Sequence, residues 1–255
     1  MYQFFVEPSQ ININDKCVII TGSDVNHIKN VLRMKVGEEI SVSNGMDGKE
    51  YRCGILSLEP DCILCQLRFI RESGVELPAK VYLFQGLPKA DKMELIIQKA
   101  VELGVYQIIP VAAKRCVVKL DQKKADAKIM RWQGIAEAAA KQSKRAVIPQ
   151  VTEVLSFEQA VKMACDINVR FIPYELAEGM DRTRGLISSL KPNQSIAVFI
   201  GPEGGFEETE IQEARTNGIE PVTLGRRILR TETAGMTVLS WIMYQLEGLP
   251  PDDKH

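Results

Sequence analysis

The second half of the chain alternates between short apolar runs and stretches with helical spacing. The apolar runs are typical of strands that are covered on both faces, in which polar residues do not alternate with apolar ones. Strand–helix–strand alternation indicates an α/β domain with a mainly parallel sheet. We expect strands at 80–86, 107–111, 170–174, 196–200 and 221–224, and helices at about 91–103, 121–144, 156–165, 181–190, 206–217 and 234–246.

The first 71 residues have a different pattern, with short strand-like runs at regular spacing. We expect strands at 4–6, 18–21, 39–42, 51–56 and 62–70. Asn44-Gly45 and Asp47-Gly48 are dipeptides that favour hairpin turns. One helix interrupts the strands, and Asp24 is its candidate cap. Strands at this spacing indicate a small β-barrel, and the polar stretch 72–78 is the expected linker.

Two of the later strands end in glycine-rich loops. Gly201-Pro202-Glu203-Gly204-Gly205 follows the strand at 196–200, and Gly225 with a basic segment follows the strand at 221–224. Thr231-Glu232-Thr233 is the expected cap of the last helix. In open α/β sheets ligands bind beyond the carboxyl ends of the strands, so these loops form the candidate site. Glycines let the backbone approach a ligand, although a tight structural turn explains one such loop equally well.

The loop at 201–205 matches neither of the two common phosphate-binding motifs. No Gly-Lys-Ser/Thr follows it, and the spacing Gly-x-Gly-x-x-Gly is absent. An α/β enzyme that binds a nucleotide in one of those two ways is therefore disfavoured.

Composition is that of an ordinary water-soluble domain, and no apolar run approaches the roughly 20 residues that span a bilayer. Residues 1–8 contain Glu7 and lack a basic start followed by an apolar core, so we expect no signal peptide, no membrane partner and a cytoplasmic location. The six cysteines form no disulfide-like framework. Cys62 and Cys65, three apart on a strand, point to opposite faces, so we expect no metal site.

The charges are unevenly distributed, although the whole chain carries a formal charge of only −1. Residues 80–150 contain fourteen Lys and Arg against six Asp and Glu, whereas 151–255 contain ten against sixteen. A basic middle region favours a partner with a phosphate backbone, although scattered solvated lysines would produce the same count.

Several stretches resemble one family. The motifs F-I-G-P-E-G-G-F-x-x-x-E (199–210) and L-G-R-R-I-L-R-T-E-T-A (224–234) resemble the SPOUT superfamily of S-adenosyl-L-methionine-dependent RNA methyltransferases. Within it, the chain resembles the RsmE family of 16S ribosomal RNA (uracil-N3)-methyltransferases. The text of 89–105 and 137–149 is similar to the same family, and 27–40 resembles the start of its PUA-like barrel. Lys114-Arg115-Cys116 departs from the family's usual Glu-Arg-Ser.

The resemblance implies a SPOUT-type trefoil-knotted α/β methyltransferase domain at 76–250, preceded by a PUA-like RNA-binding β-barrel at 1–72. It implies transfer of a methyl group from S-adenosyl-L-methionine to N3 of a uridine in 16S rRNA of the small ribosomal subunit, by a homodimer. The apolar last helix could supply the dimer interface or belong to the core. The rival interpretation is a non-catalytic RNA-binding module that has kept the fold.

The resemblance also implies roles for individual residues. Those expected to hold the cofactor are Ile200, Gly201, Pro202, Gly204, Gly205, Leu224, Gly225, Ile228, Leu229, Thr233 and Ala234. Those expected to face the RNA are Arg33, Lys89, Arg115, Gln142, Arg145 and Glu175. His27 fits an RNA contact and local packing equally well.

Methylation at N3 requires the uracil to lose its N3 proton, because the neutral imide is a poor nucleophile. A cation near O2 or O4 would stabilise the developing anion, and Arg230 is the candidate for this role. Glu232 is the candidate proton acceptor. An equally good interpretation is that Arg230 only shapes the cofactor loop. A base within a duplex cannot enter such a site, so we expect a flipped or unpaired target.

Overall fold

The computed structural model describes residues 1–177 and 179–248 of the 255-residue chain. The chain divides into two compact units. Unit 1 contains residues 1–76 and 140–148, and unit 2 contains 77–139 and the chain from 149 onward. This division differs from the expected domains 1–72 and 76–250, because 140–148 belongs with the first unit. Residues 249 and 250 of the expected second domain lie outside the described residues.

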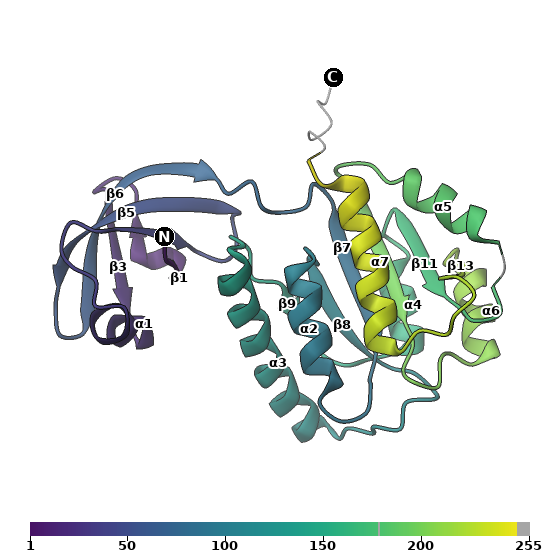
Figure 1. Ribbon diagram of the computed structural model, residues 1–255. Coiled ribbons are helices and arrows are strands. Elements are labelled where there is room, and N and C mark those ends of the chain that lie inside the picture. Colours follow the sequence, from purple (N-terminus) through teal and green to yellow (C-terminus); the bar gives the residue numbers. More distant parts are fainter. Residues whose placement is uncertain (178, 249–255) are drawn as a thin grey trace. The chain divides into compact units, whose positions relative to one another are not determined.

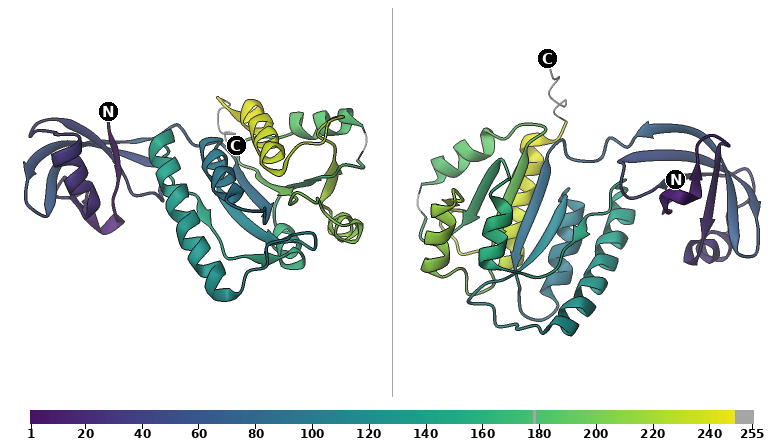
Figure 2. Two further views of the ribbon diagram at one scale, coloured as in Figure 1. Left: turned by 60° about the horizontal axis from the view of Figure 1, so that its bottom comes forward. Right: turned by 180° about the vertical axis from the view of Figure 1, so that it is seen from behind.

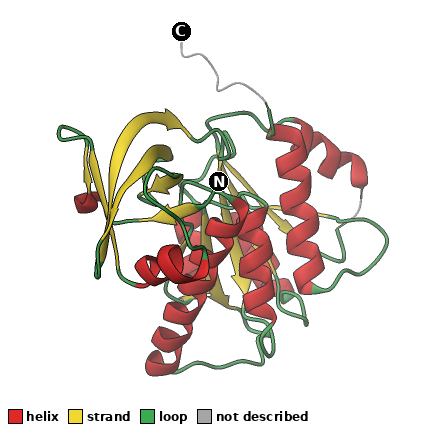
Figure 3. Cartoon of the chain, turned by 60° about the vertical axis from the view of Figure 1, so that its left-hand side comes forward, coloured by secondary structure: helices red, strands yellow, loops and turns green. Residues whose placement is uncertain are grey.

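Unit 1 is built mostly of strands (Figure 3). Its sheet has the order β1-β4-β5-β6-β3-β2, and its two edge strands are consecutive in the chain, joined by the 3-10 turn Pro8–Gln10. The sheet therefore curls back toward its own start around an apolar core that includes Ile20, Ile40 and Ile63. The strands are β1 (Gln3–Phe5), β2 (Ile11–Asn12), β3 (Cys17–Thr21), β4 (Glu39–Ser43), β5 (Lys49–Leu58) and β6 (Cys62–Glu72).

The helical segment of unit 1 differs from the expectation at its start. Helix α1 (Ser23–Asn26) has Gly22 as its N-cap and continues into the π-helical turn His27–Val31. Asp24 lies inside the first turn, and its carboxylate pairs with Lys141 at 3.3 Å, so the prediction that it caps the helix was wrong.

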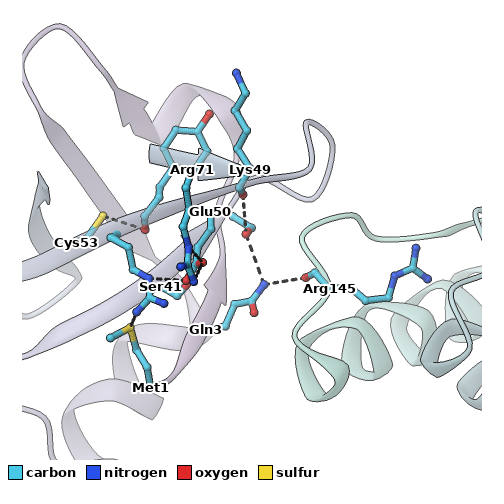
Figure 4. Close-up of polar contacts among 11 residues, drawn as sticks. Met1, Gln3, Ser41, Lys49, Glu50, Cys53, Arg71 and Arg145 are labelled. Carbon is cyan, nitrogen blue, oxygen red and sulfur yellow. Dashed lines mark hydrogen bonds and ion pairs between the residues drawn. The ribbon is translucent and has the colours of Figure 1, made fainter. Parts of the chain in front are cut away.

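Residues 140–148 join unit 1 through buried polar contacts. Glu76 accepts hydrogen bonds from Arg145 Nε at 3.0 Å and from the amides of Ala146 and Val147 at 3.1 and 3.2 Å. Gln3 Nε2 donates to the Arg145 carbonyl at 2.7 Å (Figure 4). The Arg145 side chain is only 4% exposed. This segment is therefore anchored by one carboxylate that neutralises a buried guanidinium.

Unit 2 is a seven-stranded sheet between helices. The path is β10-β8-β7-β12-β11-β13, β9 also pairs with β8, and all of these pairings are parallel, as the apolar pattern predicted. The strands are β7 (Lys80–Gly86), β8 (Gln107–Ala112), β9 (Gln150–Val151), β10 (Leu155–Ser156), β11 (Val169–Pro173), β12 (Ser195–Ile200) and β13 (Glu220–Val222). The helices are α2 (Lys92–Glu102), α3 (Gln122–Ser143), α4 (Phe157–Ala164), α5 (Met180–Ser188), α6 (Glu208–Thr216) and α7 (Thr231–Leu246), of which the last four residues of α3 belong to unit 1.

The helices cover both faces of this sheet. Phe84 and Phe199, paired in register on β7 and β12, stack with ring centroids 4.3 Å apart in a core that includes Phe157 of α4 and Ile211 of α6. Helices α2 and α7 lie side by side on the opposite face (Figures 1 and 2). Parallel strands covered on both sides explain why the sequence runs were continuously apolar.

The last helix starts earlier than its sequence predicted. Arg230 is the N-cap, and Thr231 opens α7. Thr231 does not cap the helix, because it lies one position after the N-cap; its hydroxyl oxygen accepts from Gln85 Nε2 at 2.9 Å and its proton is donated to the carbonyl of Gly201 at 2.6 Å. The Thr231 hydroxyl thus bonds to residues far away in the sequence and not to the backbone of its own helix.

Gly134, in the middle of α3, offers a direct test of helix stability. It is exposed, and a Cβ built on it would meet no atom within 4 Å. Glycine costs about 1 kcal/mol relative to alanine in a helix interior, so we expect Gly134→Ala to raise the free energy of unfolding by about 1 kcal/mol in urea. As the opposite control, Gly104→Ala should destabilise, because φ there is +85° and the Cβ would lie 2.7 Å from Leu77. If the stability of Gly134→Ala were equal to or lower than that of the wild type, the placement of residue 134 in an exposed helix interior would be contradicted.

Candidate functional site

A cavity of about 430 Å³ opens at the carboxyl ends of three neighbouring strands of unit 2. The loops that follow β11, β12 and β13 line it, together with the start of α7 and Lys92 of α2. This is the position at which open parallel sheets bind ligands, and a cavity of this volume suits a small organic molecule.

The structure brings most of the predicted cofactor residues to this cavity. Those that line it are Ile200, Gly201, Pro202, Gly205, Leu224, Gly225, Ile228, Leu229 and Ala234. Gly204 and Thr233 do not. A Cβ on Gly204 would lie 3.3 Å from Cβ of Arg115, so this glycine allows close packing behind the loop. Thr233 is exposed in the first turn of α7.

The backbone of the lining loops requires glycine at particular points. Gly225 has a φ of +109°, a conformation that other residues rarely adopt, and no atom lies within 4 Å of its missing side chain. The chain thus turns sharply at the rim while leaving its backbone accessible. Gly86, at the end of β7, lies behind the cavity, and a Cβ there would lie 2.7 Å from the backbone nitrogen of Pro202.

A buried hydrogen-bond chain fixes the glycine loop to the sheet. Gln85, on the central strand β7, donates from Nε2 to Thr231 Oγ1 at 2.9 Å and to the carbonyl of Gly86 at 2.9 Å. Thr231 in turn donates to the carbonyl of Gly201. Gln85 is fully buried. Its position in an otherwise apolar strand was the only sequence signal for this role, and the sequence reasoning missed it.

Charged groups from three elements meet beside the cavity. Lys92 Nζ lies 3.1 Å from Glu203 Oε1 and 3.4 Å from Glu232 Oε2. The hydrogen bond to Glu203 raises the pKa of Lys92. Partial burial alone would raise the pKa of Glu203, but hydrogen bonds from its own backbone, Lys92 and the Lys89 amide lower it below its usual value. Lys92 and Glu203 are therefore both charged near neutral pH.

The two predicted catalytic residues differ in position. Arg230 lines the cavity, and within the described part of the chain its guanidinium has no hydrogen-bond or ion-pair partner. Its charge therefore remains available to a ligand. Glu232 is not among the lining residues, and its side chain, 16% exposed, is paired with Lys92. The geometry thus supports an electrostatic role for Arg230 better than proton acceptance by Glu232.

The predicted RNA-facing residues fall into three groups. Glu175 lines the cavity. In unit 2 Lys89 and Arg115 are exposed, with the Lys89 amide bonded to Glu203 and the Arg115 guanidinium bonded to the carbonyl of Gly204. In unit 1 Arg33 and Gln142 are exposed.

Arg145 requires a correction. Its side chain is buried and paired with Glu76, so it does not face RNA or the cavity. The family-like text around it thus marks a structural anchor. His27 packs edge-on against Phe4, with ring centroids 6.4 Å apart, and this supports the local interpretation of that residue.

Residues 1–177 and 179–248 contain neither a metal-binding cluster nor a helix that could span a membrane. No group of three or more His, Cys, Asp and Glu side chains there is arranged to hold a metal ion. None of the helices there has the length and hydropathy needed to cross a bilayer.

Comparison with known proteins identifies the family. Residues 75–243 match the model of an RNA methyltransferase domain, and residues 20–67 match that of an RNA methyltransferase PUA domain. The ribosomal RNA small subunit methyltransferase E of Bacillus subtilis is 40% identical over 99% of this chain and 100% of its own length. The chain belongs to the ribosomal RNA small subunit methyltransferase E family. Its PUA-like and α/β parts correspond to the two matched models.

Solved structures of this family share the fold. Ribosomal RNA small subunit methyltransferase E from Neisseria gonorrhoeae, bound to S-adenosyl methionine, is 30% identical with a TM-score of 0.82, covering 96% of this chain and 97% of its own. A putative methyltransferase from Legionella pneumophila, in complex with the bound cofactor SAM, is 31% identical with a TM-score of 0.77 over 95% of each chain.

Proposed function

We propose that this protein transfers a methyl group from S-adenosyl-L-methionine to N3 of a uridine in the 16S rRNA of the small ribosomal subunit. The observation that carries the proposal is the cavity at the ends of β11, β12 and β13, lined by nine of the eleven residues expected to hold the cofactor. Membership of the methyltransferase E family supports the substrate class. The N3 position rests on the motif resemblance.

The residues present fit S-adenosyl-L-methionine. Apolar side chains such as Ile200 and Leu229 and the small Ala234 line the cavity beside backbone that glycines leave accessible. This combination suits a ligand with a flat ring and polar edges. When bound, this cofactor supplies an electrophilic methyl group on a sulfonium. The chain's own residues must bind and orient the cofactor and the uracil and must stabilise the charge that develops during transfer.

Arg230 is the residue we assign to charge stabilisation. Its unpaired guanidinium at the rim would favour the anionic form of the uracil ring, which develops as the N3 proton leaves. Arg226 and Arg227 also line the cavity and are exposed, so they can hold RNA phosphates beside it. Lys89, Arg115 and Glu175 would contact RNA in unit 2, and Arg33 and Gln142 in unit 1.

Three further features belong to the proposal: a knot, a homodimer and a cytoplasmic location. The chain returns from β13, at one edge of the sheet, to α7, which packs beside α2 and β12. Such a return is consistent with a C-terminal trefoil knot. On α7 the exposed Tyr244, together with the half-buried Met236, Trp241 and Met243, favours a homodimer. Light scattering of the purified protein tests the dimer. A ribosomal substrate would place the protein where small subunits are assembled, in the cytoplasm.

The first test is calorimetric titration with S-adenosyl-L-methionine. We expect the wild type to bind and Gly201→Trp to lose binding, because a Cβ at Gly201 already lies 3.1 Å from the Gly205 backbone and an indole there would fill the cavity. Gly185→Trp, on exposed α5 with no atom near its Cβ, is the matched control and should bind like the wild type. Absence of binding by folded wild type would overturn the proposal.

The second test concerns the reaction. Small subunits lacking the modification are incubated with protein and cofactor, and the digested rRNA is searched for N3-methyluridine by mass spectrometry. We expect Arg230→Ala to lower kcat by about 10²-fold or more, with cofactor affinity within a few-fold of the wild type. Cofactor binding without methyl transfer to any rRNA would favour a non-catalytic RNA-binding module.

A further inference from the structure

Three charged side chains connect three separate segments of the cavity wall. Lys92 belongs to the first turn of α2, Glu203 to the loop after β12, and Glu232 to the first turn of α7. Among the described residues, the ammonium of Lys92 alone forms ion pairs with both carboxylates, at 3.1 and 3.4 Å. No spacing along the sequence brings together positions 92, 203 and 232. The cluster is therefore a product of the fold.

The two carboxylates would lie close together without the lysine. Their nearest oxygens are at most about 6.5 Å apart, given their distances to Nζ. Glu232 Oε2 is buried and accepts no hydrogen bond from the described residues, so Lys92 is its one ion-pair partner among them, besides the favourable N-terminus of α7. Glu203 retains a second partner, because the Lys89 amide donates to both of its oxygens at 3.2 and 3.3 Å.

Other titratable groups near the cluster do not replace Lys92. Cys116, in the loop after β8, interacts with Glu203, but burial raises the pKa of its thiol, which stays neutral near pH 7. Arg115, in the same loop, bonds to the carbonyl of Gly204. Arg230 lines the cavity and makes no ion pair with either carboxylate. Asp91, the N-cap of α2, adds a further negative charge beside Lys92.

We propose that Lys92 is a positioning residue of the ligand cavity, whose ammonium holds Glu203 and Glu232 together and so fixes the glycine loop against the start of α7. The inference rests on the proposed function for the identity of the ligand. It assigns Lys92 no proton transfer, because a lysine held between two carboxylates stays protonated. The fixed loop carries Gly201, Pro202 and Gly205, which line the cavity.

This role predicts a pH dependence that appears only when the lysine is removed. In the wild type the pKa of Lys92 is raised and that of Glu203 is lowered, so neither group changes charge between pH 5.5 and 8. In Lys92→Gln the two carboxylates repel one another, which raises the pKa of one of them. Protonation at low pH then relieves the repulsion. The loop should be displaced at pH 8 and recover at pH 5.5.

The experiment is titration of the full chain with S-adenosyl-L-methionine at pH 5.5 and pH 8. Lys92→Gln should bind about tenfold more weakly than the wild type at pH 8, and the loss should shrink several-fold at pH 5.5. Lys92→Arg should restore affinity at both pH values. Lys99→Gln, on the same helix and paired only with Glu102, is the matched control and should bind like the wild type.

A double variant separates positioning from direct contact with the ligand. Lys92→Gln with Glu232→Gln leaves one carboxylate and no repulsion, so at pH 8 it should recover most of the affinity that Lys92→Gln loses, even where the single variant folds poorly. A pH-independent loss that the second substitution does not rescue would make Lys92 a ligand contact and overturn the inference. Unchanged affinity of Lys92→Gln at pH 8 would also overturn it. Failure of the wild type to bind would instead contradict the proposed function.

Discussion

Gly86→Ala is expected to abolish measurable cofactor binding and to destabilise unit 2 by about 3 kcal/mol. The added methyl would lie 2.6 Å from Cδ and 2.7 Å from N of Pro202, which is closer than real side-chain contacts. The obstacle is backbone at the end of one strand meeting the loop of its neighbour, so no side-chain rotation relieves it. Either β7 separates from β12 or the glycine loop moves into the cavity.

The measurement pairs thermal unfolding with calorimetric titration. Gly185→Ala adds the same methyl group on exposed α5, where no atom lies within 4 Å, so it should leave cofactor affinity unchanged and, as a glycine-to-alanine change within a helix, should raise stability by about 1 kcal/mol rather than lower it. Wild-type affinity in Gly86→Ala would show that the loop tolerates displacement. The lining of the cavity would then depend less on the contact between β7 and Pro202 than we infer.

Glu76→Ala is expected to cost unit 1 about 3 kcal/mol, because it removes the carboxylate that pairs with the buried guanidinium of Arg145. The carboxylate also accepts the amides of Ala146 and Val147, so the whole segment 140–148 loses its anchor. Hydrogen exchange of those two amides should accelerate by orders of magnitude, a local readout that does not require two-state unfolding of the whole chain.

Glu72→Ala is the matched control, because this exposed carboxylate makes no hydrogen bond or ion pair with the described residues. It should leave the exchange rates and the unfolding free energy nearly unchanged. A related test applies to Arg145, which sequence similarity suggested as an RNA contact and which the structure places in the buried pair with Glu76. Loss of RNA binding in Arg145→Ala should come with loss of unit 1 stability, and a fully stable variant that no longer binds RNA would contradict the buried role.

The sequence pattern predicted strand positions well where burial dominates. The strand at 80–86 was predicted with its observed bounds, and 196–200 and 107–111 each differ by one residue, because continuous apolar runs reflect burial on both faces. Glycine loops after two strands likewise led to the cavity. These features depend on residues that are neighbours in the sequence, so the sequence pattern is enough to predict them.

The features that the sequence did not reveal depend on partners far apart in the chain. Gln85 meets Thr231, Lys92 meets Glu203 and Glu232, and Glu76 meets Arg145. Helix starts were misplaced for the same reason. Thr231 looked like a cap because its hydroxyl suits that role, but that hydroxyl accepts from Gln85 and donates to the carbonyl of Gly201 instead. Local propensity allows several positions for a helix start, and contacts with residues far away in the chain determine which of them is used.

The chain passes between the two units three times, after residues 76, 139 and 148. Neither unit can therefore be obtained whole by cutting the gene once. A fragment ending at residue 76 would lack the segment that neutralises Glu76, and a fragment starting at residue 77 would still carry that segment without its carboxylate. Recombination between relatives at this boundary would pair an arginine from one parent with a glutamate from the other. We therefore expect chimeras of two relatives to fold only when residues 140–148 come from the same parent as residues 1–76.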